Sequence, residues 1–152
     1  NLPLYPATIQ LTGIDLSQEM LDKAVERVQS LAMPNVTLKV MDATSLDFGD
    51  NDFDKAVATY TISAVPDPVA VLCEMRRVVK PGGIIVIMNH FRSERRPMGW
   101  LEDLVAPVCT RLGWKSNLAL KPLLAQVGLE PELVAKANMF NGWRLVKCVN
   151  RK

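Results

Sequence analysis

Two different hydrophobic patterns alternate along the chain. Strand-like runs, rich in β-branched and other apolar residues, occupy residues 8–14, 36–41, 54–62 and 84–89. Apolar residues at helical spacing follow the capping residue Ser17 as far as residue 31, and a second helical run extends from Asp67-Pro68 to Val79. Residues 84–89 (IIVIMN) are almost wholly apolar, which indicates a strand buried on both faces of a parallel sheet. The β-α-β order therefore predicts an α/β fold with a doubly wound, Rossmann-like, mostly parallel sheet.

The last third of the chain predicts a different arrangement. Residues 97–127 contain one or two helices around Gly113-Trp114, and residues 133–149 predict a closing antiparallel hairpin that turns at residues 140–142. Trp114, Phe140 and Trp143 are interpreted as packing residues of this region. Because the chain shows no internal repeat and no low-complexity segment, residues 1–152 are predicted to form a single domain.

Composition narrows the possible partners. Of the 152 residues, 49% are hydrophobic and 22% are charged, as in ordinary soluble globular proteins. A formal net charge of +2 is too small to indicate a nucleic-acid partner. Cys73, Cys109 and Cys148 are far apart and form no CxxC pair, so neither a disulfide framework nor a metal site is indicated. We expect three small core residues and a reducing, cytoplasmic setting.

Acidic residues follow the first two predicted strands. Asp15 comes directly after the first strand, and Asp42-Ala43 follows the second. Ligands of such sheets bind at the carboxyl ends of the strands, where Asp15 can accept hydrogen bonds from ribose hydroxyls. Asp42 can accept from an exocyclic amine while the Ala43 amide donates to a ring nitrogen, so the pair predicts an adenosine site. The alternative for Asp15 is a carboxylate that only stabilises the N-terminus of the following helix.

Three segments occur in a diagnostic order: GIDLSQEML, VMDATSLDF and FDKAVATYTISAVPDPVAVLCEMRRVVKPGG. In residues 8 to about 90 the chain resembles the class I S-adenosylmethionine-dependent methyltransferases. YTISAVPDP followed by IMNHFRSE is similar to the bacterial phosphatidylethanolamine N-methyltransferases, while ubiquinone and menaquinone methyltransferases share the general motif order. The resemblance implies S-adenosylmethionine as cofactor and S-adenosylhomocysteine as product. It also implies that Leu16, Met20 and Thr59 bind the cofactor together with Asp15, Asp42 and Ala43.

One motif of that family has no counterpart in this chain. Its glycine-rich loop, E/D-x-G-x-G-x-G, follows a first strand that precedes the residues matched here, whereas Gly13 lies within a predicted strand. The sequence is therefore interpreted as a methyltransferase domain that lacks its first βα unit. The resemblance further implies an N-terminal amphipathic membrane-binding helix. Without the loop, a non-catalytic binding module is the second hypothesis, and an NAD-dependent Rossmann oxidoreductase is the third.

Two residues near the ends of the third and fourth strands are predicted to be catalytic. His90, the only histidine, can take a proton from an acceptor ammonium or hydrogen-bond a lipid phosphate. Tyr60 can present an aromatic face to a cationic headgroup, which favours binding through cation–π attraction. The alternatives are a structural histidine and a tyrosine packed on the sheet.

A further group of residues is predicted to bind the substrate. Phe91 and Trp100 offer aromatic faces, and Arg92, Arg95 and Arg96 form a basic cluster next to them. Such a cluster can bind a phosphodiester or an anionic bilayer surface. The alternative is a solvated loop with no ligand. The predicted function is N-methylation of phosphatidylethanolamine toward phosphatidylcholine by a protein peripherally bound to the inner face of the membrane.

Overall fold

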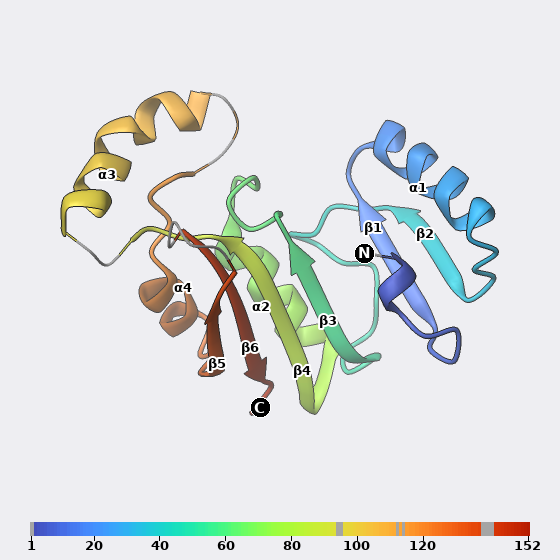
Figure 1. Cartoon of the computed structure of the whole chain (residues 1–152). Coiled ribbons are helices and arrows are strands. Elements are labelled where there is room, and N and C mark those ends of the chain that lie inside the picture. The colour runs from blue at the N-terminus through green and yellow to red at the C-terminus, as the bar shows by residue number, and fades with distance from the viewer. Residues whose placement is uncertain (1, 94–95, 112, 114, 138–141) are drawn as a thin grey trace. The chain divides into compact units, whose positions relative to one another are not determined.

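The computed structural model describes residues 2–93, 96–111, 113, 115–137 and 142–152. It divides into two compact units, Asn1–Asp47 and Phe48–Lys152, which are described one at a time (Figure 1). The single domain expected from the sequence stays a prediction. The α/β class is confirmed, since helices alternate with mostly parallel strands before a C-terminal antiparallel hairpin.

The first unit is built on two parallel strands. It contains a short 3₁₀ helix (Leu2–Leu4), β1 (Leu11–Asp15), α1 (Gln18–Ser30) and β2 (Val36–Val40). Leu11 of β1 lies opposite Val36 of β2, and Asp15 lies opposite Val40. Ser17 caps α1 as predicted, because its hydroxyl accepts a hydrogen bond from the Met20 amide at 3.4 Å. Strand β1 begins at Leu11, three residues later than the hydrophobic pattern predicts.

The second unit contains a four-stranded sheet in the order β3-β4-β6-β5. Its strands are β3 (Phe53–Thr59), β4 (Val79–His90), β5 (Pro131–Lys136) and β6 (Trp143–Val149). Strands β3 and β4 are parallel, whereas β6 runs antiparallel to both β4 and β5. The predicted closing hairpin is therefore confirmed. Most of its predicted turn, including Phe140, lies outside the described residues.

Three helices accompany this sheet. They are α2 (Pro68–Val78), α3 (Arg96–Arg111) and α4 (Leu120–Gln126). Asp67 caps α2 as predicted, accepting a hydrogen bond from the Ala70 amide at 2.9 Å. Figure 1 shows α2 and α4 on one face of the sheet. The fully buried Ile85 and Ile87 of β4 share the covered face with Val146 and Cys148 of β6.

Asn150 fastens the C-terminal end of the chain to the junction between α2 and β4. Its side-chain amide donates to the carbonyl oxygens of Arg76 at 2.9 Å and Val79 at 2.7 Å. Its backbone exchanges two hydrogen bonds with Gly82 and Gly83, both at 2.8 Å. The residue is fully buried, so these bonds are made away from water, where an unpaired carbonyl is costly. Asn150 therefore holds the Pro-Gly-Gly segment, which lies in the first part of β4 and not at the end of α2.

Two of the three cysteines are core residues as expected, and the third is not. Cys109 and Cys148 are buried as predicted, and burial raises the pKa of the Cys148 thiol to about 11. Cys73, however, is exposed, because it lies on the outer side of α2 while Leu72 and Met75 face the core. Within the described ranges, no group of three or more His, Cys, Asp or Glu side chains is placed to hold a metal ion. None of the described helices combines the length and hydrophobicity needed to cross a membrane.

Candidate functional site

The first unit brings the two predicted strand-end acids to one edge. Because β1 and β2 are parallel, Asp15 and the residues after Val40 lie at the same end of the pair. The Met41 amide donates to the Asp15 carbonyl at 3.0 Å, which places Asp42 one residue away from the Asp15 backbone. Leu16 and Met20 beside this edge are exposed, at 71% and 53%. The edge thus offers two carboxylates next to apolar surface, a combination that suits a nucleoside.

The Asp15 carboxylate stabilises the N-terminal end of α1, as in the alternative interpretation, and still presents a hydrogen-bond acceptor. Its Oδ1 accepts a hydrogen bond from the Ser17 amide at 2.9 Å, which orders the entry to α1. Among the residues that the structure describes, none donates a hydrogen bond to the other oxygen, Oδ2. The same carboxylate can therefore shape the loop and accept a ligand hydroxyl.

Asp42 is held as an ionised acceptor by Thr44. The amide and the hydroxyl of Thr44 both donate to Asp42 Oδ1, each at 2.8 Å. These hydrogen bonds hold the pKa of the Asp42 carboxyl below its ordinary value, since they favour the charged form. Thr44 was not predicted as part of the site, although Asp-x-Thr is a local turn signal. Ala43 between them is half-buried.

In the second unit, three aromatic rings meet around the end of the sheet. Tyr60 follows β3, His90 ends β4, and Trp143 lies opposite His90 at the start of β6. The Trp143 ring is 5.0 Å from that of Tyr60 and 5.8 Å from that of His90, both edge to face. Tyr60 is 56% exposed. We call Tyr60, His90 and Trp143 the aromatic cluster.

The backbone around the aromatic cluster is constrained at two points. Tyr60 has a positive φ of 63°, which is uncommon for a residue with a side chain, and its amide donates to the Met88 carbonyl at 2.8 Å. A Cβ atom at Gly142 would overlap Nε2 of His90, so a larger residue at that position would displace the imidazole. Trp143 was predicted as a packing residue, and its place in the cluster follows from the β4–β6 register.

Glu102 of α3 adds a carboxylate beside the imidazole. Its Oε1 lies 3.8 Å from His90 Nε2, and its Oε2 accepts a hydrogen bond from the Ser93 amide at 2.6 Å. The Glu102 side chain is only 12% exposed. Burial lowers the pKa of His90 below 6.5, and the Glu102 charge partly opposes that shift. The imidazole is therefore neutral at neutral pH and able to accept a proton.

The other predicted residues differ in burial and in their partners. Phe91 is fully buried, which is core packing, and its amide donates to the Gly142 carbonyl at 2.7 Å. Arg92 is engaged by Asp103 through two hydrogen bonds of 2.9 and 2.6 Å. Trp100 on α3 is 68% exposed, and Thr59 is the half-buried last residue of β3.

Two members of the predicted basic cluster are described incompletely. Arg95 lies outside the described residues, and of Arg96, the first residue of α3, only the backbone is described. The roles assigned to Phe91, Trp100, Thr59 and the arginines stay predictions.

The family model and two related proteins that match this chain are all methyltransferases. A family model described as a methyltransferase domain matches residues 2–87. Phosphatidylethanolamine N-methyltransferase of Cereibacter sphaeroides is 42% identical over 131 residues, which are 86% of this chain and 64% of that protein. Demethylmenaquinone methyltransferase of Staphylococcus aureus (strain MRSA252) is 43% identical over 83 residues, 55% of this chain and 34% of that protein. The chain thus spans less than two thirds of the length of these relatives.

Solved structures show the same fold at lower identity. The cyclase SpnF superposes with a TM-score of 0.77 at 19% identity, covering 94% of this chain and 66% of that one. A SAM-dependent methyltransferase from Methanosarcina mazei gives 0.71 at 20% identity, covering 92% and 81%. Since one of these proteins is a cyclase, the fold alone does not fix the reaction.

The environment of His90 generates a direct prediction. Because it is the only histidine in the chain, its imidazole can be followed without ambiguity in an NMR pH titration. We expect a pKa below 6.5, and Glu102→Gln should lower it further, because it removes a neighbouring negative charge that favours the imidazolium. Asp103→Asn, one residue along the same helix, should leave the pKa nearly unchanged. A rise of the His90 pKa in Glu102→Gln would contradict this account.

Proposed function

Since the chain belongs to the methyltransferase-domain family, we propose that it is part of an S-adenosylmethionine-dependent N-methyltransferase acting on phosphatidylethanolamine. The observation that carries the proposal is the aromatic cluster with Glu102 beside it, because aromatic rings and a carboxylate together favour a cationic amine. The relative from Cereibacter sphaeroides supports the same substrate class.

The edge of the first unit fits the adenosyl part of the cofactor. When bound, S-adenosylmethionine supplies an electrophilic methyl group on a sulfonium sulfur. Asp15 would accept from the ribose hydroxyls, and Asp42, kept ionised by Thr44, would accept from the exocyclic amine of the adenine. Ala43 would donate its amide to the ring, while the exposed Leu16 and Met20 would cover it. Thr59 is assigned to the same cofactor through the resemblance alone.

The aromatic cluster would prepare the acceptor. The primary amine of the headgroup is an ammonium at neutral pH and has no lone pair to attack a methyl group. Neutral His90 would take one proton from it, and Glu102 would stabilise the resulting imidazolium. Tyr60 and Trp143 would hold the nitrogen as it becomes a fixed cation, at roughly 0.5–2 kcal/mol for each ring. Repetition of these steps leads toward phosphatidylcholine.

A quinone acceptor is the main alternative. The demethylmenaquinone methyltransferases match about half of this chain at 43% identity. The family match at residues 2–87 does not separate the two substrates, because His90, Glu102 and Trp143 lie beyond it. Methylation of a carbon in a quinone ring would give no fixed cationic nitrogen for Tyr60 and Trp143 to hold. The amine is therefore the substrate that these residues favour.

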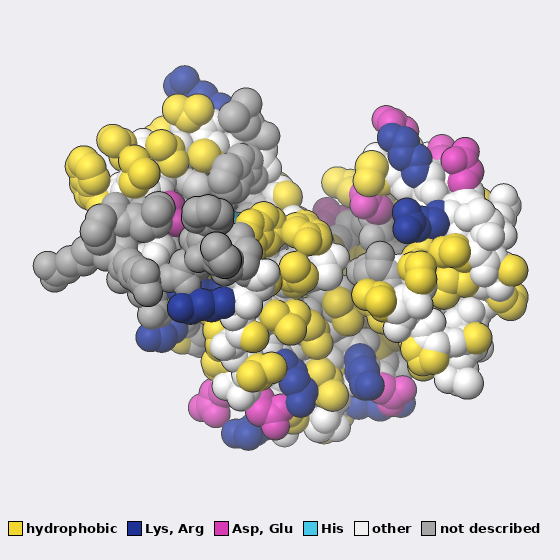
Figure 2. Space-filling model, viewed as in Figure 1, with side chains coloured by type: hydrophobic (Ala, Val, Ile, Leu, Met, Phe, Trp, Pro, Cys, Tyr) yellow, Lys and Arg dark blue, Asp and Glu magenta, His cyan; other side chains and the backbone are white. Residues whose placement is uncertain are grey.

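Helix α3 supports a location at a membrane surface. Among the α3 side chains that the structure describes, Ala106 and Cys109 face inward with Glu102, whereas five larger apolar ones face solvent: Trp100, Leu101, Leu104, Val105 and Val108. Figure 2 shows hydrophobic side chains gathered on this helix. A solvent-facing apolar stripe of this kind is typical of helices that lie in a bilayer interface. We assign this face, together with the predicted Arg92–Arg96 cluster, to the inner surface of the membrane.

The cofactor assignment predicts selective loss of binding. Asp15→Ala should weaken S-adenosylhomocysteine binding at least about tenfold, since each charge-assisted hydrogen bond contributes about 1.5–3 kcal/mol. Asp42→Ala should weaken it as well, but should spare an analogue that lacks the exocyclic amine. Calorimetry on the intact protein measures both, with Asp22→Ala on α1 as the control. Unchanged affinity in a folded Asp15→Ala protein would remove Asp15 from the site.

The acceptor assignment predicts a loss of rate without a loss of cofactor. His90→Ala should lower methyl transfer to phosphatidylethanolamine by about 10²–10⁴, the range of a general base, while cofactor affinity changes less than about twofold. In the wild type the rate should fall as the pH drops through the His90 pKa. Transfer of a labelled methyl group to phosphatidylethanolamine and to demethylmenaquinone compares the two acceptors.

Two other outcomes of the methyl-transfer assay would change the proposed function. If the wild type methylates only the quinone, the amine assignment is wrong and the methyltransferase assignment stands. If the intact protein methylates no acceptor, a non-catalytic binding module replaces both.

The membrane assignment predicts that polar substitutions on α3 release the protein from vesicles. Leu104→Asp with Val108→Asp should reduce partitioning at least about tenfold, because an apolar side chain gains roughly 1.5–3 kcal/mol when fully buried. Leu133→Asp on β5, also half exposed, is the matched control. Alanine at positions 92, 95 and 96 should chiefly reduce the salt dependence of binding to anionic vesicles. Equal partitioning of the α3 variant and its control would exclude this helix.

A further inference from the structure

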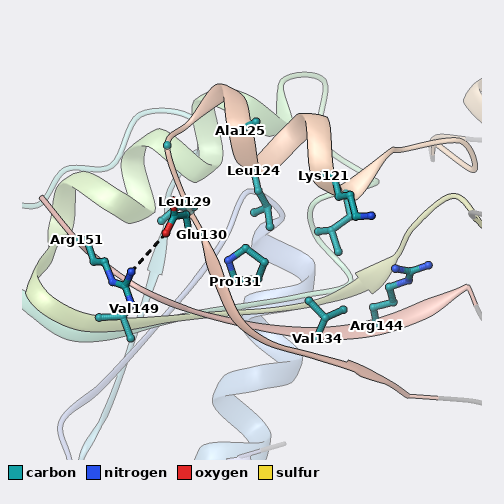
Figure 3. A pocket seen from close by; sticks show the side chains of 12 residues that line it. Lys121, Leu124, Ala125, Leu129, Glu130, Pro131, Val134, Arg144, Val149 and Arg151 are labelled. Atoms are coloured by element: carbon teal, nitrogen blue, oxygen red, sulfur yellow. Dashed lines mark hydrogen bonds and ion pairs between the residues drawn. The ribbon is translucent and has the colours of Figure 1, made fainter.

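A cavity of about 630 Å³ lies between α4 and the β5–β6 hairpin of the second unit (Figure 3). Its volume is within the range of small-molecule sites. None of the residues assigned above to cofactor, acceptor or membrane lines it. It is lined by Leu120, Lys121, Leu124, Ala125, Gly128, Leu129, Glu130, Pro131, Val134, Arg144, Val149 and Arg151.

The lining is apolar in the middle and charged at two ends. Figure 3 shows Leu124, Pro131 and Val134 between the ends. At one end Glu130 and Arg151 form an ion pair of 3.4 Å, so their charges offset each other. Lys121 and Arg144 lie at the other end, where the cavity lining contains no acid. The cavity therefore combines an apolar trough with an end that is lined by two basic side chains.

The guanidinium of Arg144 is incompletely hydrogen-bonded among the described residues and lies close to another cation. It is half-buried in β6, and among the described residues its buried Nε has no hydrogen-bond partner. Lys136 of β5 lies directly opposite it in the sheet, and two like charges in that position repel each other. Glu132, the acid nearest to Lys136 in β5, is already paired with Lys147 at 2.6 Å. An anion beside the Arg144 guanidinium would offset these two positive charges and relieve the repulsion.

We propose that this cavity binds a long-chain carboxylate. The carboxylate group would lie on Arg144, whose planar guanidinium matches two carboxylate oxygens, with Lys121 beside it. The hydrocarbon chain would follow the trough past Leu124, Pro131 and Val134. This site depends on neither the methyl acceptor nor the cofactor, so it stands or falls independently of the proposed reaction.

Three ligands separate the requirements for charge and chain. Dodecanoate has both the chain and the carboxylate, dodecyltrimethylammonium has the same chain with the opposite charge, and acetate has the carboxylate alone. Calorimetric titration of the intact protein, below the micelle concentrations, should show saturable binding of dodecanoate only. Equal binding of the cationic amphiphile would overturn the proposal, because it would mean adsorption to apolar surface. Acetate binding as tightly as dodecanoate would overturn the assigned chain and leave a site for small anions.

Variants locate the bound molecule. Arg144→Gln should weaken dodecanoate binding about tenfold or more, and Val134→Trp, at a half-exposed position in the trough, should block it. Lys55→Gln removes an exposed cation from β3, outside the cavity lining, and should leave the affinity unchanged, as should Leu104→Asp on α3. If Arg144→Gln fails to fold, Lys121→Gln and Val134→Trp test the same site from α4 and β5. Full affinity in the folded variants would refute it.

Discussion

The pairing of β4 with a strand on each side is the constraint on which the second unit depends. Its parallel register with β3 puts Thr59 opposite Met88, and its antiparallel register with β6 puts His90 opposite Trp143. Because successive side chains of a strand point to opposite faces, a slip of one residue would exchange the buried and exposed sets. The fully buried Ile85 and Ile87 make such a slip costly. The core therefore fixes which rings meet in the aromatic cluster.

Features that depend on neighbours in the chain could be predicted from the sequence. Ser17 and Asp67 cap their helices through contacts three residues away, and the strands follow from short apolar runs. The acids at 15 and 42 could be placed together, since parallel strands end at the same edge. Contacts between distant segments could not be predicted: Glu102 lies beside His90 twelve residues away, and Trp143 contacts Tyr60 because β3 and β6 flank the same strand, β4. Nothing in the local pattern around either residue specifies that partner.

Helix α3 shows a second feature that hydrophobic spacing in the sequence cannot predict, namely which side of a helix is buried. A hydrophobic stripe predicts a helix, but it does not say whether the stripe faces a core or another apolar medium. Here the inward side contains Glu102, which is held by the Ser93 amide and lies beside His90, while Trp100 and Leu104 face outward. The rotation of the helix about its axis that places Glu102 beside His90 also turns the apolar stripe toward solvent.

The left-handed backbone of Tyr60 has a consequence for the balance between stability and activity. A side chain at φ 63° raises the energy of the folded state, whereas glycine adopts this conformation readily. Glycine at position 60 would therefore lower the conformational energy of the turn after β3, but it has no aromatic ring. Under the proposed function, selection for thermal stability alone would tend to remove Tyr60, whereas selection for recognition of a cation would retain it. Position 60 is thus a place where a more robust protein and a more active one would call for different amino acids.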